Sequence, residues 1–438
     1  MNNLTVFGRE LIDDNSFEQI KNCYGEEDIA VLTADAHYGY GHPIGGAVAY
    51  KNKISLSGVG FDIGCGNKAV RTDIKASEID VSKIMDEIFK RISFGVGRKN
   101  NERADDPIFE KIRNADFAPQ HALASLAESQ LGTVGSGNHF VDIFEDEDGF
   151  LWIGVHFGSR GFGHKTATGF IALSQGMKFT DKGKEGSMDS PPILFDADSE
   201  LGLSYIEAMT IAGEYAYAGR DMVVRKVLEI LDYPSVTFSV HNHHNFAWRE
   251  THFGEEYWVV RKGCTPAFPG QQGFVGATMA DISVVVEGVD SQLSREGLYS
   301  TVHGAGRVMS RTMAAGKKKI RKTWKCLDYR NCDGSLPIQT LRSADGANPK
   351  CPKCGHKTSR SETVDIIKEG VVNFGEVKTR MGNDKIELRG AGADEAPQCY
   401  KKLEDVLSAQ GETIKVIHRL RPIGVAMAGS DVVDPYKD

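Results

Sequence analysis

Long apolar segments are missing from this 438-residue sequence. No run of 18 apolar residues occurs, and the first 30 residues contain no apolar segment of the kind that directs secretion. A membrane span is therefore not indicated, and a cytoplasmic protein is expected. The formal net charge of −8 argues against binding nucleic acid over the whole surface, although it is compatible with a local basic groove.

Internal repeats and a regular alternation of strands with helices are missing as well. A repeat architecture is therefore excluded, and a doubly wound parallel sheet is not specified. Apolar residues at helical spacing predict helices over 81–92 and 205–231, whereas β-branched residues predict strands over 235–240 and 282–289. With 40% hydrophobic residues, the chain can bury one large core or a few domains.

The sequence also has no Walker or Rossmann fingerprint for nucleotides. It contains instead the short segments "GSGN", "GSRG" and "HGAGR", whose backbone amides can form turns that bind anions. Positive charge for phosphate is available in or beside the glycine-rich segments from Arg160, Arg261, Lys262 and Arg307. Taken singly, each segment is better explained as a simple tight turn.

Glycine is abundant, with 48 residues, and it clusters around polar side chains. The stretch "GVGFDIGCG" (58–66) sets Asp62 and Cys65 three residues apart among four glycines. A lone histidine is more often a hydrogen-bonded structural residue, but imidazole, thiolate and carboxylate together are the ligands expected for manganese, zinc or iron. Because a thiolate sulfur can bridge two cations, the pattern predicts a two-metal centre. The candidate histidines are His139, His156, His241, His243, His244 and His303.

Eight cysteines at uneven spacing favour metal binding or catalysis over disulfides in an intracellular chain. Cys326 and Cys332 are followed, after eighteen intervening residues, by the pair Cys351 and Cys354, which has the CxxC spacing of a zinc knuckle. We predict a structural zinc site with these four ligands, and free thiols are the alternative. The adjacent basic run "GKKKIRKTWK" (316–325) is by itself typical of a solvated face.

Seven motifs in order carry a resemblance to a known family. They are "DAHYGYGHPIGG", "GVGFDIGCG", "GTVGSGNHF", "VHFGSRGFGH", "HHNFAWRETHFG", "RKGCTPAFPGQQG" and "HGAGRVMSR". The series resembles the RtcB family of 3′-phosphate RNA ligases from Asp35 to Arg311, and the resemblance resumes at "RPIGVAMAG" (421–429).

The resemblance implies an α+β fold with one large catalytic domain of mixed β-sheets packed with helices. This catalytic domain is expected over 1–322 and 361–438, and the small zinc-ribbon-like insertion is expected over 323–360.

The resemblance also assigns roles to individual residues. His303 matches the histidine that attacks the α-phosphate of GTP and becomes guanylylated, and Cys65 takes the place that bridges two manganese ions. The full set of implied metal ligands is Asp62, Cys65, His139, His156 and His244. Contacts to GTP or its phosphates are expected from Asn138, Asp142, Asn245, Thr278, Gly304, Ala305, Gly306 and Arg307. Contacts to RNA are expected from Asp35, Arg160 and Lys262.

The implied reaction joins an RNA end with a 3′-phosphate or 2′,3′-cyclic phosphate to a 5′-hydroxyl end, in RNA repair or tRNA splicing. It needs GTP and two Mn²⁺ ions in addition to the structural Zn²⁺, and an archease-like activator is a candidate partner. Two other classes stay open at this stage: a metal-dependent phosphoesterase with the same ligands but no guanylylation, and a non-catalytic protein that binds RNA ends.

Several positions depart from the family's usual residues. Asp142 stands where a glutamate is usual, Thr278 replaces a serine, Phe157 replaces a small polar residue, and Gly64 replaces an asparagine found in some members. The C-terminal lysine expected against guanine is missing from "GVAMAGSDVVDPYKD", so GTP preference is less firmly implied than metal binding. Lys437 and Asp431 are the candidates to replace that lysine.

Overall fold

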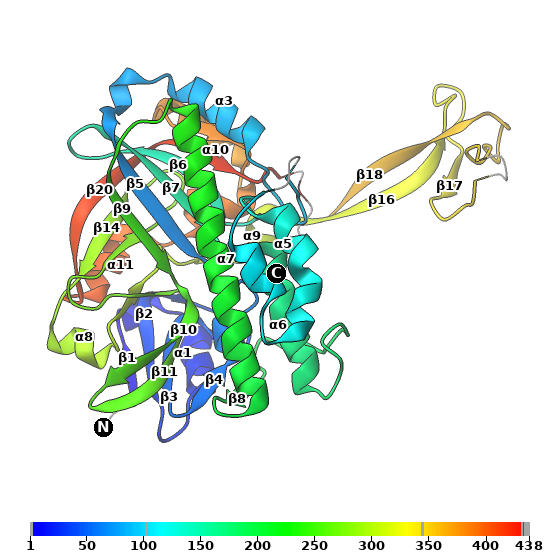
Figure 1. Cartoon of the computed structure of the whole chain (residues 1–438). Helices are drawn as coiled ribbons and strands as arrows, with labels where there is room; N and C mark the ends of the chain where they lie inside the picture. Colours follow the sequence, from blue (N-terminus) through cyan, green and yellow to red (C-terminus); the bar gives the residue numbers. More distant parts are fainter. Residues whose placement is uncertain (1–2, 101–103, 343–345, 431, 433–438) are drawn as a thin grey trace.

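Two β-sheets from distant parts of the chain meet at the centre of the computed structural model, and a two-stranded arm projects from one side (Figure 1). The structure describes residues 3–100, 104–342, 346–430 and 432. Helices cover the outside of the sheets, so the α+β prediction is confirmed. None of the described helices is long and apolar enough to cross a membrane.

The larger sheet has eight strands, and most of its neighbours run antiparallel. Only β19 pairs in parallel with its neighbour β20 among these described strands. The order along the sheet is β13 (Gln272–Val275), β14 (Ser283–Gly288), β20 (Ile414–Met427), β6 (Phe140–Glu145), β7 (Phe150–Phe157), β5 (Gly66–Lys75) and β9 (Val236–His243), with β19 (Glu387–Arg389) beside β20. The predicted strands 235–240 and 282–289 correspond to β9 and β14.

The second sheet has five strands. Three of them come from the first 50 residues of the chain, and the other two form a later hairpin. Its order is β1 (Leu4–Val6), β2 (Ile29–His37), β3 (Ile44–Tyr50), β11 (Glu255–Lys262) and β10 (Asn245–His252). Two short pairs complete the body: β12 (Cys264–Pro266) with β15 (Ser300–Val302), and β4 (Lys53–Ser55) with β8 (Leu194–Asp196).

The longest helix, α7 (Glu200–Ile230), runs across the molecule and packs against β5 and β7 of the large sheet (Figure 1). Its start is fixed by Ser199, whose side chain accepts a hydrogen bond from the Gly202 amide, as an N-cap residue does. The prediction of a helix over 205–231 is confirmed, and α3 (Val81–Arg91) confirms the one over 81–92.

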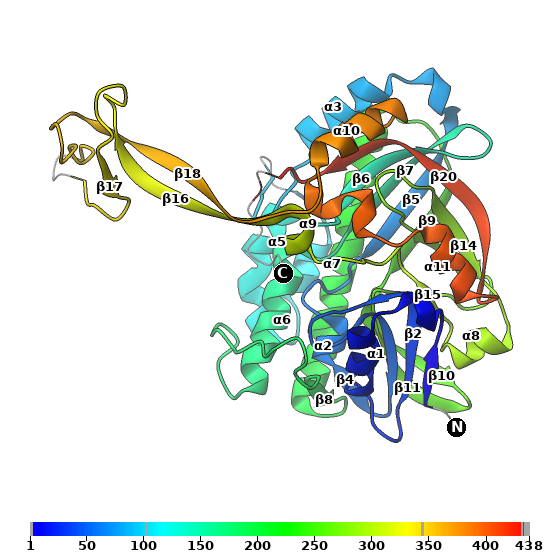
Figure 2. The ribbon, with the colours of Figure 1, turned by 180° about the vertical axis from the view of Figure 1, so that it is seen from behind.

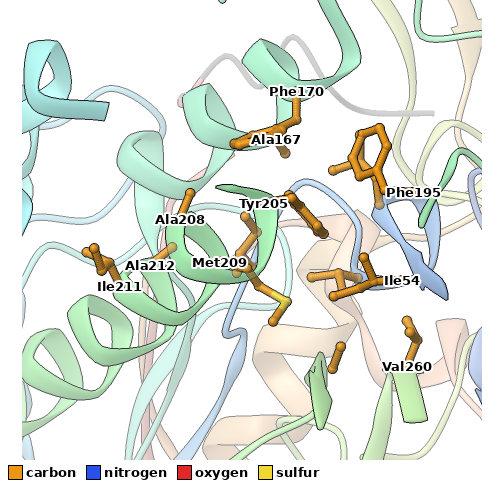
Figure 3. Close-up of a cluster of buried hydrophobic side chains, with 14 of the residues drawn as sticks. Ile54, Ala167, Phe170, Phe195, Tyr205, Ala208, Met209, Ile211, Ala212 and Val260 are labelled. Carbon is orange, nitrogen blue, oxygen red and sulfur yellow. The ribbon is translucent and has the colours of Figure 1, made fainter. Parts of the chain in front are cut away.

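A buried apolar cluster holds α7 against α6 (Arg160–Ser174) and the small sheets (Figure 3). Tyr205 and Met209 of α7 meet Phe170 of α6, Phe195 of β8 and Ile54 of β4, all of them almost fully inaccessible to solvent. Removal of this apolar surface from water is the main stabilising contribution in this region.

The remaining helices are short. They are α1 (Asp14–Lys21), α2 (Leu56–Val59), α4 (Ile108–Arg113), α5 (Ala124–Gln130), α8 (Gln292–Glu296), α9 (Arg311–Ala315), α10 (Phe374–Asn383) and α11 (Leu403–Gln410), together with the 3₁₀ turns η1 (Arg9–Leu11), η2 (Ala76–Glu78), η3 (Ala118–Leu123), η4 (Ala393–Glu395) and η5 (Pro397–Cys399).

The arm consists of β16 (Gly316–Cys326) and β18 (Thr358–Glu369), with the short strand β17 (Ser335–Pro337) beside β16 near the tip. Both views show it extending away from the body (Figures 1 and 2). The predicted limits of the insertion, 323 and 360, lie within β16 and β18, so the division into domains stays a prediction.

Candidate active site

The predicted metal ligands meet because their strands end at one edge of the large sheet. Cys65 comes directly before β5, His139 directly before β6, and His156 is the penultimate residue of β7. The antiparallel register pairs His156 with both Asn67 and Phe140, so these three strands bring their ligands together. His244 joins them from the turn between β9 and β10, where its amide donates to the Cys65 carbonyl at 2.8 Å.

Cys65 belongs to two groups of potential metal-binding side chains. It lies with His156 and His244 in one group and with Asp62 and His139 in the other, and the ligand atoms within each group are all within 4.8 Å of one another. The sulfur is 3.4 Å from Nε2 of His156 and 3.6 Å from Nε2 of His139. The carboxylate of Asp62 is 3.1 Å from Nε2 of His139. A thiolate at this point can contact two cations at once.

Burial and neighbouring charges shift the pKa values of these groups. Burial would raise the pKa of Asp62, but the hydrogen bond and charge of His139, together with the charge of Arg160, lower it to about 2. Burial, and next the Asp62 charge, raise the pKa of Cys65 well above its usual range. Burial also lowers the pKa values of His156 and His244 well below theirs, with a smaller contribution from the charge of His303. The imidazoles are therefore neutral, which is the protonation state that ligates metals.

Two glycines allow the ligands to approach their neighbours. A Cβ atom on Gly158 would lie 2.3 Å from Oδ1 of Asp62, and one on Gly135 would lie 2.2 Å from Nδ1 of His139. Both distances are far below van der Waals contact, so any side chain at either position would displace a ligand. The glycine-rich blocks around the ligands thus have a steric cause.

His303 faces the ligand groups from the opposite side. It follows β15, and its ring centroid is 4.9 Å from that of His244. Its Nδ1 lies 2.6 Å from Oδ2 of Asp35, which also accepts the backbone amide of His303 at 3.0 Å. Since a carboxylate can only accept, Nδ1 carries a proton, and Nε2 is the ring nitrogen that does not contact Asp35.

Asp35 itself is fully buried in β2 and held by several donors. Burial would raise its pKa, but the charge and hydrogen bond of His303 and the hydroxyl of Thr33, 2.6 Å from Oδ1, hold the pKa below the usual value. The structure places the Asp35 carboxylate against His303, and the predicted contact of Asp35 with RNA stays a prediction. Lys401 donates to the carbonyls of Ala34 and Ala36 on either side of it.

The ligand groups and His303 line one cavity of about 240 Å³ between the two sheets. All eight residues predicted to contact GTP or its phosphates also line it: Asn138, Asp142, Asn245, Thr278, Gly304, Ala305, Gly306 and Arg307. Their predicted contacts with GTP stay predictions, but the structure does bring them together around His303.

Two of these residues have protein partners that fix them. The guanidinium of Arg307 donates to Glu395, at 3.2 Å, and to the hydroxyl of Tyr400, at 2.9 Å. The amide oxygen of Asn245 accepts from Gly263 at 2.8 Å. Arg311 also lines the cavity and donates to Glu395 at 2.9 Å, so η4 and the residues after η5 are tied to the rim.

The remaining residues predicted to contact RNA have different surroundings. Lys262 lines the cavity, and its ammonium donates to the Tyr40 carbonyl at 2.7 Å. Burial lowers the pKa of Lys262 to about 8. Arg160 packs against the glycine-rich turn before β6, where a Cβ atom on Gly135 would lie 2.4 Å from its Nη1.

Some of the positions that depart from the family's usual residues have a structural explanation. Asp142 is buried, accepts the Ala426 amide at 3.3 Å, and has its pKa raised well above the usual value by burial. Phe157 is fully buried in the core beside α7. Met427 lines the cavity near the end of the described chain, whereas Asp431 and Lys437 lie outside the described residues.

A buried arginine that the sequence motifs did not identify holds the ligand-bearing segments together. Arg220, near the middle of α7, has no solvent-exposed surface. Its Nη1 donates to the carbonyl of Gly64 at 2.9 Å and to that of Phe157 at 2.6 Å. Its Nη2 is 3.0 Å from Nδ1 of His243. These three partners are the sequence neighbours of Cys65, His156 and His244, so one guanidinium positions three proposed ligands. The sequence feature that could have identified Arg220 is a charged residue on the apolar face of the helix predicted over 205–231.

The four cysteines at the tip of the arm form a third group of potential ligands. Cys326, Cys332, Cys351 and Cys354 place their sulfur atoms within 4.8 Å of one another. Backbone hydrogen bonds from Cys354 and Lys353 outweigh burial, the largest single influence, and lower the pKa of Cys351 to about 7. Four convergent thiols match the tetrahedral sulfur site that zinc prefers.

Comparison with known proteins agrees with this geometry. The family described as "tRNA-splicing ligase RtcB" matches residues 18–119 and 110–333, which include every motif from Asp35 to Arg311. The chain belongs to the RtcB family. The resemblance found in the motifs is thereby confirmed.

Relatives in all three domains of life cover most of this RtcB chain. The "RNA-splicing ligase RtcB" of Escherichia coli K12 is 28% identical over 427 residues, which is 90% of this chain and 88% of the relative. The "tRNA-splicing ligase RtcB" of Thermococcus kodakarensis is 28% identical and aligns over 97% and 95% of the two chains. The "RNA-splicing ligase RtcB homolog 1" of Entamoeba dispar is 31% identical over 64% of this chain and 65% of its own.

We expect Arg220→Lys to weaken Mn²⁺ binding by about 10- to 100-fold, because the single ammonium nitrogen of lysine cannot occupy the positions of both Nη1 and Nη2. Calorimetric titration with Mn²⁺ measures the effect. Arg225→Lys, an exposed position on the same helix, is the matched control and should bind as wild type does. An unchanged Mn²⁺ affinity in folded Arg220→Lys protein would contradict the positioning role.

Cys351→Ser should lose about one zinc ion per chain while the body stays folded, because the cysteine group lies at the far end of the arm. Elemental analysis gives the zinc content, and circular dichroism follows the helices of the body. Lys353→Ala, an exposed neighbour in the same turn, should retain its zinc. Wild-type protein that contains no zinc after purification without chelators would exclude the site.

Proposed function

We propose that this chain is an RNA ligase that joins an RNA 3′-phosphate or 2′,3′-cyclic phosphate end to a 5′-hydroxyl end through guanylylated His303, using GTP and two Mn²⁺ ions. The observation that carries the proposal is the common cavity. Two potential ligand groups share Cys65, and a histidine with a fixed tautomer lies beside them. The printed names of the relatives describe RNA-splicing and tRNA-splicing ligases, which agrees with this assignment.

The residues fit the proposed metal ions. One ion would be held by Cys65, His156 and His244, and the other by Asp62, Cys65 and His139. Nδ1 of His244 is buried without a hydrogen-bond partner, so a metal ion would satisfy a nitrogen that the protein leaves unpaired. When bound, two divalent cations supply positive charge that neutralises the triphosphate and helps pyrophosphate to leave.

His303 acts as the nucleophile in the first step. Its Nε2 lone pair attacks the α-phosphorus of GTP, the N–P bond forms, and the bond to the bridging oxygen breaks as pyrophosphate departs. The proton stays on Nδ1, where the Asp35 carboxylate accepts its hydrogen bond and stabilises the positive charge that develops on the ring. Asp35 is thus a positioning residue.

The next two steps return His303 to its starting state. An oxygen of the RNA 3′-phosphate attacks the same phosphorus, the N–P bond breaks, and GMP becomes joined to the RNA end. The 5′-hydroxyl of the second RNA then attacks the RNA phosphorus and gives up its proton, and GMP leaves with the bridging oxygen. A 2′,3′-cyclic phosphate enters this sequence after water opens it to a 3′-phosphate.

The lining residues suit a nucleotide with several phosphates. Gly304, Ala305 and Gly306 follow His303 without large side chains, so the backbone can approach the phosphates closely. Gly306 has a φ of +74°, and a Cβ atom there would lie 2.1 Å from the Asp35 carbonyl oxygen. Asn138 and Thr278 add polar groups to the lining of the cavity. An archease-like activator and a cytoplasmic location belong to this proposal through the family resemblance.

Cys65→Ala should reduce manganese occupancy at both positions together, because one sulfur serves both ligand groups. Elemental analysis should fall from about two ions per chain toward none, rather than to one. Cys264→Ala, another buried cysteine that lies outside these ligand groups, is the matched control. Occupancy of two in folded Cys65→Ala protein would disprove the bridging assignment.

His303→Ala should abolish the covalent GMP adduct and the joining of 3′-phosphate ends, and it should leave Mn²⁺ binding intact because His303 is not a proposed ligand. Labelled GTP with Mn²⁺, resolved on a denaturing gel, measures the adduct. The wild-type adduct should be labile in acid and stable in base, as a phosphoramidate is. Asp35→Asn should lower the rate of adduct formation by about two to four orders of magnitude, since the tautomer is no longer fixed.

A bypass experiment separates the nucleophile from a structural residue. RNA supplied with GMP already on its 3′-phosphate should still be joined by His303→Ala, because the last step no longer needs the covalent enzyme. Label retained by His303→Ala would refute the assignment. Wild-type protein that never acquires label would favour the phosphoesterase if it releases phosphate from RNA ends, and the RNA-end binder if it does not.

A further inference from the structure

The arm, residues 316–370, concentrates positive charge in an otherwise acidic protein. The arm contains thirteen lysines and arginines and six acidic residues, whereas the whole chain has a formal net charge of −8. Uneven charge of this kind steers polyanions to one part of a surface.

Several basic side chains on the arm are neutralised by acidic neighbours. Arg321 donates from Nε and Nη2 to the Asp365 carboxylate at 2.8 to 3.1 Å, and Lys322 contacts Glu362 at 2.9 Å. Six others are exposed and have no ion pair with any described residue: Lys325, Arg330, Arg342, Lys350, Lys357 and Arg360. These six are available to a negatively charged ligand.

Two of the available arginines are held by one buried tryptophan. Trp324 is 2% exposed, and its indole nitrogen donates to the Thr340 carbonyl at 3.2 Å. The guanidinium carbons of Arg342 and Arg360 lie 5.7 and 5.4 Å from its ring centroid. Arg360 is also the direct cross-strand partner of Trp324. The ring therefore orders two guanidinium groups before any ligand binds, and each can still contact phosphate.

The arm begins at the rim of the cavity. Arg311, which lines the cavity, opens the short helix α9, and β16 follows directly at Gly316. Trp324 is eight residues along β16, which is roughly 26 Å from the base of the arm at 3.3 Å per residue. That distance corresponds to about eight base pairs of a duplex. An RNA with stacked bases whose end lies in the cavity can reach Trp324 only if it is longer than this.

We propose that Arg342 and Arg360, ordered on Trp324, bind backbone phosphates of the substrate RNA away from the end that is joined. The inference rests on the proposed function, because it takes the ligand of the cavity to be an RNA end. This assignment gives the two kinds of basic residue on the arm different roles. The ion-paired residues stabilise the arm, and the exposed residues without an ion pair contact the RNA backbone. The arm then adds affinity for long RNA without touching the reacting groups.

The test compares two fluorescent RNAs that end in a 3′-phosphate, a 6-nucleotide strand and a 30-nucleotide hairpin, bound to the full-length zinc-containing protein. Arg342→Ala with Arg360→Ala should weaken hairpin binding by about tenfold at 100 mM KCl. The slope of log K against log[KCl] should become shallower by roughly 1.5, as expected for two lost phosphate contacts. Binding of the 6-nucleotide RNA and formation of the GMP adduct should not change. Retained zinc shows that the tip of the variant is folded.

The matched control removes the same charge from the same arm. Arg321→Ala with Lys322→Ala also deletes two cations, but both are paired with carboxylates, so hairpin affinity should change less than twofold. An equal loss in this control would mean diffuse attraction and would overturn the assignment to Arg342 and Arg360. Unchanged hairpin binding in Arg342→Ala with Arg360→Ala would also overturn the assignment, and it would favour a protein partner for the arm. An equal loss of affinity for the 6-nucleotide RNA would overturn the assignment as well.

Failure of this inference is distinguishable from failure of the proposed function. If wild-type protein never acquires a GMP label but the arginine variant still loses hairpin affinity, the ligase mechanism is wrong and the arm assignment stands. If labelling and joining proceed and hairpin affinity is unaffected, the arm assignment alone is wrong.

Discussion

The buried guanidinium of Arg220 is the interaction on which the candidate site depends. It donates to the carbonyls of Gly64 and Phe157 and lies against His243, so it links three segments that are far apart in the chain. Burial lowers its pKa to about 10, so it stays charged at neutral pH. A buried charge is stable only with its partners in place. The ligand-bearing segments therefore cannot separate without exposing an unsatisfied cation, which makes the geometry around Cys65 rigid.

The second constraint is that the site is divided between two sheets. The large sheet supplies the potential metal ligands at one edge, whereas β2 of the smaller sheet supplies Asp35, which orients His303. Neither sheet alone contains both the potential metal ligands and Asp35. The hydrogen bonds from Lys401 to Ala34 and Ala36, and from Arg307 to Glu395, tie the C-terminal part of the chain to this junction. Chemistry at the junction thus requires the whole body to be folded.

The arm carries a separate group of potential metal ligands outside the cavity. Its cysteine group fixes a tip that has little apolar core of its own, and Trp324 is the large buried side chain near it. Small modules of this kind are commonly stabilised by metal because they bury too little apolar surface. A tip stabilised in this way can project exposed arginines into solvent at a defined distance from His303. Catalysis and RNA retention are then assigned to separate parts of one chain.

The sequence alone determined the family, the α+β class, the helices over α3 and α7, and the residue types of the site, because glycine-framed motifs report local backbone demands and helices follow local periodicity. It did not reveal Arg220, whose role depends on contacts between α7 and two segments more than 60 residues away from it. It also did not reveal the contact between Asp35 and His303, since a carboxylate in a motif does not show which atoms surround it. Only the tertiary structure decided these points, because strand register and burial select the partners of each polar group.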